Sequence, residues 1–430
     1  MTISEPAGTP PISRRLRRAL AVLVFLLGLA FALARVAPLR DVGALRVGTP
    51  WIMSDFRHAV YYPSRAFWQG LNPYSSSRYM ERYPVTTVVS PYAPASFLLF
   101  APFGLLPLGP ASVAYFILTV VLTLVLAWAA LRLSGWQAST SAILAVAGIL
   151  LLARPGHWNL LSGQVTLIVV LAFYAALTWA RSSPQLAGAG LALALLKPSF
   201  GLPLIPVLLA RGAPRAVAWG LGIAAALNIP ILLLLVRREG GPSSFLTTVA
   251  QSYGMFASRP ENDVLQGVWR VDLVASLSRI LNYRLGTLAV LLVTTVILGV
   301  LIVVSRRLVK PDDPTQRRIL DGLACCAVLL CFYHQAYDLL LLALPSVALA
   351  RVVYEKSPPR AIHVLQALLF TILSINYLAT LSALAALQLA TWARLVVVSA
   401  NGLALIGLFG FYLVEAQRAD RLASSAGLRD

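Results

Sequence analysis

Charged residues are scarce in this sequence of 430 residues: Asp, Glu, Lys and Arg together make up 12% of it, whereas 59% is hydrophobic. The mean hydropathy is +0.78. This composition excludes a soluble globular domain and a disordered chain. Many apolar runs approach or exceed the ~20 residues that a helix needs to cross a bilayer, and they are too long for the alternating strands of a membrane barrel. The sequence therefore predicts an all-α polytopic membrane protein.

Acidic residues are scarcer still, with 16 Asp and Glu against 35 Lys and Arg, which gives a formal net charge of +19. In a soluble protein this excess would suggest nucleic-acid binding. Here the basic residues lie mostly in loops between apolar runs, where they set topology or meet lipid head groups. We see no carboxylate cluster suited to Mg²⁺ or Mn²⁺ and no Gly-rich nucleotide loop. We therefore expect no nucleic-acid partner and no cofactor, with a divalent cation as the alternative.

Cysteine occurs only three times, as Cys325, Cys326 and Cys331, all within one apolar run. Adjacent cysteines inside a membrane segment do not suit a disulfide framework or a zinc site. We expect three buried thiols that behave as small apolar residues.

The hydropathy pattern predicts twelve helices, and the fifth and sixth are too short to span a 30 Å core upright. Lys197-Pro198 separates these two, because proline disfavours helix at the preceding residue. Residues 186–210 are therefore either one kinked span or two short helices that turn at Lys197. The predicted helices are 17–37, 111–133, 139–153, 163–180, 186–196, 199–210, 214–236, 285–305, 318–333, 336–353, 361–385 and 394–416.

Loop charges favour two short helices. With two short helices, the short loops on the side away from the termini carry little besides Arg154 and Lys197. The positive-inside rule then makes both termini cytoplasmic. The long loops 38–110 and 237–284 then lie outside the cytoplasm. Arginine greatly outnumbers lysine, which is typical of a GC-rich bacterial genome and indicates a bacterial plasma membrane. The loops on the side of the termini carry Arg181, Arg211, Arg306, Arg307, Lys310, Arg317, Lys356 and Arg360.

We interpret residues 1–430 as one integral membrane domain, with a core at 17–353, C-terminal helices at 361–416 and a cytoplasmic tail at 417–430. The basic cluster before Ala19–Ala34 also fits a signal peptide, but a retained first helix suits a membrane protein better. Loop 38–110 is expected to hold an amphipathic helix near 58–70 and an interfacial stretch at 95–106.

Polar residues are predicted to gather on the outer face. Asp55 follows the first helix, His157-Trp158-Asn159 and Gly163-Gln164 precede the fourth, Lys197 turns between the short helices, and His334-Gln335-Ala-Tyr337-Asp338 lies between the ninth and tenth. Ionisable groups at membrane depth are costly, so several facing one cavity indicate function.

Structural alternatives exist for each of these residues. Asp55 would also serve as a helix cap or as the ion-pair partner of Arg57, and Lys197 would reach the interface by snorkelling. His334 suits a helix end, Gln164 a contact between helices, and Asp338 an ion pair inside the bundle. Tyrosines and tryptophans in the loops also serve as interface anchors.

The order of short motifs resembles the polyprenol-phosphate-mannose-dependent mannosyltransferases, glycosyltransferase family 87 of the GT-C superfamily. The resemblance spans roughly residues 17–350. One departure is Ala93-Pro94, where the family usually has a proline pair. The motifs are Asp55, Gly70-Leu-Asn72-Pro-Tyr74, Tyr83-Pro84, Ser90-Pro-Tyr92-Ala-Pro94, Leu106-Pro107, Gly163-Gln164, Gly188-Ala-Gly190-Leu-Ala-Leu-Ala-Leu-Leu196-Lys197-Pro198, Arg211 and Tyr333-His334-Gln-Ala-Tyr337.

The resemblance implies a GT-C fold and an enzyme that moves a sugar, with mannose expected, from a polyprenyl phosphate to a hydroxyl of a glycolipid or other membrane-associated glycan, with inversion. It implies that Asp55 is the general base, that His334 lies near the lipid phosphate and that Lys197 forms the Lys-Pro turn. The chemistry of the residues agrees, because inverting transfer needs one carboxylate to deprotonate the attacking hydroxyl. The phosphate leaves as a stable anion and needs positive charge instead of a second acid.

We assign phosphate binding to Lys197, His334 and the loop arginines Arg57, Arg259 and Arg270. Two other classes stay open: a transporter or flippase of lipid-linked sugars, which would carry internal repeats and a midplane site, and a membrane scaffold. The residues assigned to sugar and acceptor binding are His58, Asn72, Tyr74, Tyr92, His157, Gln164, Gln335, Tyr337 and Asp338.

Overall fold

The computed structural model describes residues 13–36, 52–85, 90–308, 313–355 and 360–425, and in this part of the chain every regular element is a helix. Six of these helices are long and apolar enough to cross a membrane, or seven if the bent pair α7–α8 counts as one span. The six lie within Arg14–Arg35, Leu108–Leu133, Pro214–Arg238, Thr287–Arg307, Ala336–Glu355 and Thr391–Leu422. The predicted helical membrane protein is confirmed at this level.

All twelve predicted helices fall on helices of the structure. They correspond to α1 (Arg14–Val36), α6 (Leu108–Leu133), α7 (Thr140–Leu152), α9 (Thr166–Trp179), α10 (Pro184–Ala194), α11 (Pro198–Ala210), α12 (Pro214–Arg238), α15 (Thr287–Arg307), α16 (Pro314–Cys331), η4 with α17 (Ala336–Leu342 and Ala343–Glu355), α18 with α19 (Ala361–Ile375 and Leu381–Leu387), and α20 (Thr391–Ser425). Four of these helices, α10, α11, α12 and α16, begin with a proline, which suits the first turn of a helix.

One predicted loop is wrong. Residues His157-Trp158-Asn159 belong to helix α8 (Arg154–Ser162), whose axis is bent by 74° from that of α7. Pro155 occupies the first turn of α8, where its missing N–H costs nothing.

The long loops also contain helices. The predicted amphipathic helix near 58–70 is present as η2 (Phe56–Tyr61) and α2 (Tyr62–Trp68), and the stretch 95–106 holds α4 (Ser96–Leu99) and α5 (Ala101–Leu105). Helix α3 (Ser76–Arg82) in the first loop, and α13 (Pro242–Ala257), η3 (Pro260–Asn262) and α14 (Leu273–Ile280) in the second, were not predicted. Residues 37–51 and 86–89 of the first loop, with Lys310, Lys356 and 426–430, lie outside the described residues.

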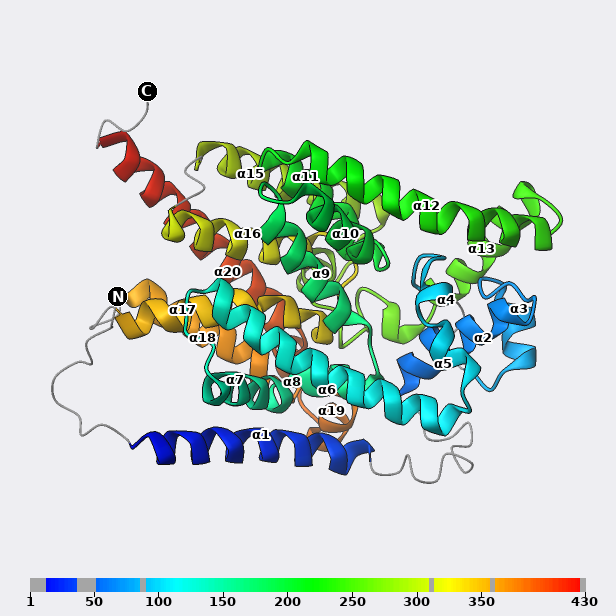
Figure 1. Cartoon of the computed structure of the whole chain (residues 1–430), viewed down its shortest axis with the longest axis horizontal. Coiled ribbons are helices and arrows are strands. Elements are labelled where there is room, and N and C mark those ends of the chain that lie inside the picture. Colours follow the sequence, from blue (N-terminus) through cyan, green and yellow to red (C-terminus); the bar gives the residue numbers. More distant parts are fainter. Residues whose placement is uncertain (1–12, 37–51, 86–89, 309–312, 356–359, 426–430) are drawn as a thin grey trace.

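Figure 1 shows α2–α5 and α13 gathered at one end of the bundle, whereas α1 begins and α20 ends at the other end. The first helix packs closely on α7, because Gly28 and Gly148 let the two backbones approach: a Cβ on Gly148 would lie 2.7 Å from the backbone of Val24. Cys325, Cys326 and Cys331 are buried free thiols on α16, as expected. Because α2–α5 and α13 lie at the same end of the bundle, the two long loops share that end.

Candidate active site

Asp55 opens the short helix η2, and its half-buried carboxylate is held from one side by an amide. Gln164 Nε2 donates to Asp55 Oδ2 at 2.5 Å, and the Tyr92 hydroxyl donates to Gln164 Oε1 at 2.8 Å. Tyr92 occupies the only acceptor of the amide, so the amide hydrogens are directed at Asp55. This chain of contacts orients the carboxylate as an acceptor.

Gly163 sets the position of Gln164. It ends α8 in the left-handed conformation, with φ 72°. A Cβ at this position would lie 2.6 Å from Phe56 Cβ and 3.1 Å from Met53 Sδ. The turn after α8 therefore packs directly against the residues that flank Asp55.

We expect Gly163→Ala to lower turnover by about a hundredfold, because moving a reacting group by ~1 Å costs about that much. The positive φ alone costs alanine roughly 1–2 kcal/mol of stability. Gly240→Ala is the matched control, since Gly240 has φ 84° but open space around its Cβ. Equal turnover in the two variants, measured with the same detergent preparation, would show that close packing at Gly163 does not position Asp55.

A second group of side chains surrounds Asp338, at the start of η4. The Lys197 ammonium forms an ion pair with Asp338 Oδ1, and the Thr166 hydroxyl donates to the same oxygen at 3.0 Å. His334 Nδ1 lies 3.0 Å from the other oxygen, Oδ2, which also accepts from the Gln335 backbone N–H at 3.1 Å. Asp338, Lys197 and His334 are all buried. The alternative that Asp338 makes an ion pair inside the bundle describes this contact.

The two groups lie side by side. Gln164 contacts Asp55, and Thr166, two residues later at the start of α9, lies 3.5 Å from Lys197 Nζ and contacts Asp338. The charges of Lys197 and Asp338 both act on the Asp55 carboxylate. The start of α9 thus joins Asp55 to the group around Asp338.

Lys197 also faces two aromatic rings. Its Nζ lies 4.8 Å from the centre of the Tyr337 ring and 5.2 Å from that of Phe200, within the range of cation–π attraction. The lysine follows α10 in an extended conformation at the turn before α11. It is directed into the bundle instead of snorkelling to the interface.

Arg57 and Arg259 lie near His58, close to Asp55 in the chain. Arg57 and His58 are buried on η2, and Arg259 is half-buried at the end of α13. Burial, and then the charges of the two arginines, lower the pKa of His58 to about 3. The imidazole is therefore neutral at physiological pH, and the guanidinium groups supply positive potential here.

Arg270 serves a different purpose. Its Nε and Nη2 each donate to Asp272 at 2.9 Å, and its guanidinium stacks on Tyr333 at 4.9 Å. Gln335 donates to the Tyr333 hydroxyl, which itself donates to Asn262 Oδ1 at 2.8 Å. The bidentate pair orients Arg270 within the loop, and the contacts of Arg270 and Asn262 with Tyr333 hold the second long loop against the residues around His334.

Three predicted binding residues lie apart from Asp55. Asn72 Nδ2 donates to Glu239 at 3.0 Å, and the Tyr74 hydroxyl donates to the backbone oxygen of Tyr92 at 2.6 Å. His157 packs against Phe31 of α1, with ring centres 4.3 Å apart and the rings tilted by 31°. Asn72 and Tyr74 thus hold the loop behind Tyr92, and His157 packs α8 on α1.

Comparison with known proteins now bears on this arrangement. The family model for glycosyltransferase family 87 matches residues 91–331, more than half of the chain. The chain belongs to glycosyltransferase family 87. No curated protein matches it. Tyr92, Gln164 and Lys197 lie within the matched residues of this glycosyltransferase, whereas Asp55 and His334 lie outside them.

Thr166 was not predicted from the sequence, although it is the first residue of α9 and lies two residues after Gln164. Its hydroxyl is the group that reaches both Lys197 and Asp338. A threonine in an apolar helix usually bonds its own backbone, so its spacing of two residues from Gln164 was the only signal. Phe200 was not predicted as a neighbour of the Lys197 ammonium, because a phenylalanine in an apolar helix is typical of the hydrophobic core.

The pH dependence of this glycosyltransferase should reflect Asp55. Burial is the main cause that raises the pKa of its carboxyl above 3.8, and the nearby Asp338 charge adds to it, while Gln164, Ser162 and Lys197 oppose the shift. If transfer requires the carboxylate, kcat/KM falls as the pH drops through this raised pKa of the free enzyme. Because the folded state retains the proton longer than the unfolded chain, the contribution of Asp55 to stability falls as the pH rises between the two pKa values. An acid limb of kcat/KM at or below 3.8 would contradict this expectation.

Proposed function

We propose that this glycosyltransferase moves a sugar from a polyprenyl phosphate to an acceptor hydroxyl with inversion, and that Asp55 is the general base. The observation that supports this most is the placement of one half-buried carboxylate, oriented by Gln164 and Tyr92, beside the buried cation Lys197. Inverting transfer from a phosphate needs one base and positive charge on the leaving group.

In the proposed reaction, Asp55 accepts the proton of the acceptor hydroxyl as its oxygen attacks the anomeric carbon. The bond between that carbon and the phosphate oxygen breaks, and the lipid phosphate leaves as an anion. We assign the phosphate to the side of Lys197 and His334, with Arg57 and Arg259 adding positive potential. Arg270 is left out of this set, because Asp272 and the backbone oxygen of Asn262 together accept from all three of its nitrogens.

We further propose mannose as the sugar, a glycolipid or other membrane-associated glycan as the acceptor, and a reaction without a metal. The end of the bundle where α1 begins and α20 ends would face the cytoplasm of a bacterium, and the end with α2–α5 and α13 would face outward (Figure 1). In this proposal all twelve predicted helical segments belong to a GT-C fold, with the broken helices counted as spans.

The test uses purified protein in proteoliposomes with radiolabelled polyprenyl-phosphate mannose and candidate glycolipid acceptors. We expect label in a new glycoside, with the anomeric configuration inverted. Movement of label across the bilayer with no new glycoside would instead identify a flippase and overturn the proposal.

A further inference from the structure

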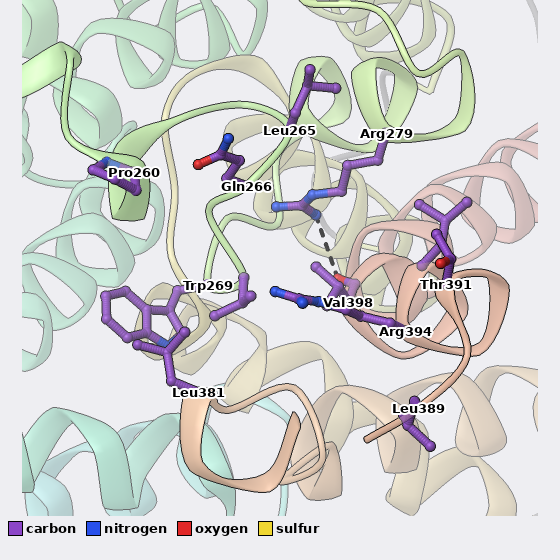
Figure 2. Close-up of a pocket in the computed structure, with 12 residues that line it drawn as sticks. Pro260, Leu265, Gln266, Trp269, Arg279, Leu381, Leu389, Thr391, Arg394 and Val398 are labelled. Carbon is purple, nitrogen blue, oxygen red and sulfur yellow. Dashed lines mark hydrogen bonds between the residues drawn. The ribbon is translucent and has the colours of Figure 1, made fainter. Parts of the chain in front are cut away.

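A cavity of about 580 Å³ lies between the second long loop and the C-terminal helices. Its wall consists of loop residues before α14, of α14 itself and of the segment from α19 to the first turns of α20 (Figure 2). The cavity has the size of a small-molecule site. Most of its lining is apolar, from Leu265, Val268, Trp269, Leu381, Leu389 and Leu395.

Two guanidinium groups enter this cavity, and no acidic residue is among the described residues that line it. Arg279 of α14 and Arg394 of α20 reach into the same space (Figure 2). Burial lowers the pKa of Arg279 to about 10, so it remains protonated at neutral pH. Arg279 is fixed in place because it donates to the backbone oxygens of Gly267, Arg270 and Val398.

The two carboxylates whose charge acts on Arg279 are paired with other arginines. These are Asp263 and Asp272. Asp263 lies 2.7 Å from Arg284 Nη2, and Asp272 is held by Arg270. Neither acid therefore balances Arg279 or Arg394, and the described lining of the cavity combines two positive charges with apolar side chains.

We infer that this cavity binds the phosphate group of an anionic membrane lipid, with Arg394 on the phosphate, Arg279 adding positive charge, and the leucines along the first part of the hydrocarbon chain. Arginine suits phosphate because its planar fork presents paired donors. The cavity adjoins the active site without sharing its residues: the Val271 N–H donates to the His334 oxygen at 3.0 Å, and the Ala336 N–H donates to the Trp269 oxygen at 3.0 Å. Its far wall, from α19 and α20, lies beyond the residues matched by the family model.

The experiment measures lipid binding by native mass spectrometry of the detergent-purified protein, titrated with phosphatidylglycerol and, separately, with phosphatidylcholine. We expect tighter binding of phosphatidylglycerol, and about a tenfold loss of affinity in Arg394→Ala with a larger loss in Arg394→Glu. Arg237→Ala is the matched control, because Arg237 is an exposed arginine at the end of α12 and does not line the cavity. The control should bind as the wild type does.

Three results would overturn the inference. They are equal affinity for the two lipids, an Arg394→Ala variant that binds like Arg237→Ala, and full displacement of phosphatidylglycerol by inorganic phosphate at equal concentration, which would make the cavity a site for free phosphate. Asp55→Asn should bind phosphatidylglycerol normally, so failure of this inference and failure of the proposed reaction are distinguishable. Thermal unfolding of each variant checks that the fold is intact.

Discussion

Asp55→Asn should fold normally and lose about a hundred- to ten-thousandfold of its transfer rate, the range that a general base contributes. The substitution keeps the shape of the side chain and removes its ability to accept the proton of an attacking hydroxyl. Gln164 would still contact an oxygen at this position, so the local structure should persist. The rate is measured as formation of radiolabelled glycoside under single-turnover conditions.

Asp313→Asn is the control for loss of a carboxylate. Asp313 caps α16, where its Oδ1 accepts from the Thr315 backbone N–H at 2.8 Å, and asparagine caps a helix about equally well. This variant should keep the wild-type rate. If Asp55→Asn were also to keep most of the rate, Asp55 could not be the base, whatever the effect on sugar-donor binding.

Lys197→Met should be the most destabilising single substitution of the site, because it leaves the buried Asp338 carboxylate without its ion-pair partner. Breaking a buried pair from one side typically costs about 3–5 kcal/mol. The double variant Lys197→Met, Asp338→Asn should recover most of this loss, since a neutral amide can still accept from Thr166. Unfolding in detergent by denaturant or heat measures the stability of all three proteins.

The single and double variants also distinguish a role of Lys197 in the reaction from a role in stability alone. If Lys197 acts on the phosphate, the double variant should regain stability but keep a low rate of sugar transfer, because the cation is absent. Full recovery of the rate together with stability would mean that Lys197 only balances Asp338. A single Lys197→Met variant as stable as the wild type would contradict the buried ion pair itself.

Hydropathy predicted the helices well, because a bilayer-spanning segment must satisfy its own backbone and be apolar along its length. The prediction failed where these conditions relax. Helix α8 is short and polar on one side, and α13 lies in a loop between membrane segments, so neither produces a long apolar run. Periodicity and proline positions therefore located spans but not the short helices between them.

The candidate site shows a similar division. Of the polar residues expected on one face, Gln164, Lys197 and His334 do meet around Asp55 and Asp338, because costly groups in a membrane segment need partners. His157 does not, because it packs against Phe31 of α1. Which of them pair with each other was not predictable. Lys197 and Arg270, both assigned to phosphate, are each held by an aspartate. A sequence carries no direct information on a contact such as Lys197–Asp338, between residues 141 positions apart, whereas Arg270 and Asp272 are separated by a single residue and the pair was overlooked.

The positions of α1 and α20 in Figure 1 decide whether the chain crosses the membrane an even or an odd number of times. Helix α1 begins and α20 ends at the same end of the bundle, so the chain between them must cross from one end to the other an even number of times. The seven spans obtained by counting the bent α7–α8 pair are an odd number. If all seven cross, at least one shorter apolar helix, such as Thr166–Trp179, Pro198–Ala210 or Ala361–Ile375, must complete a further crossing.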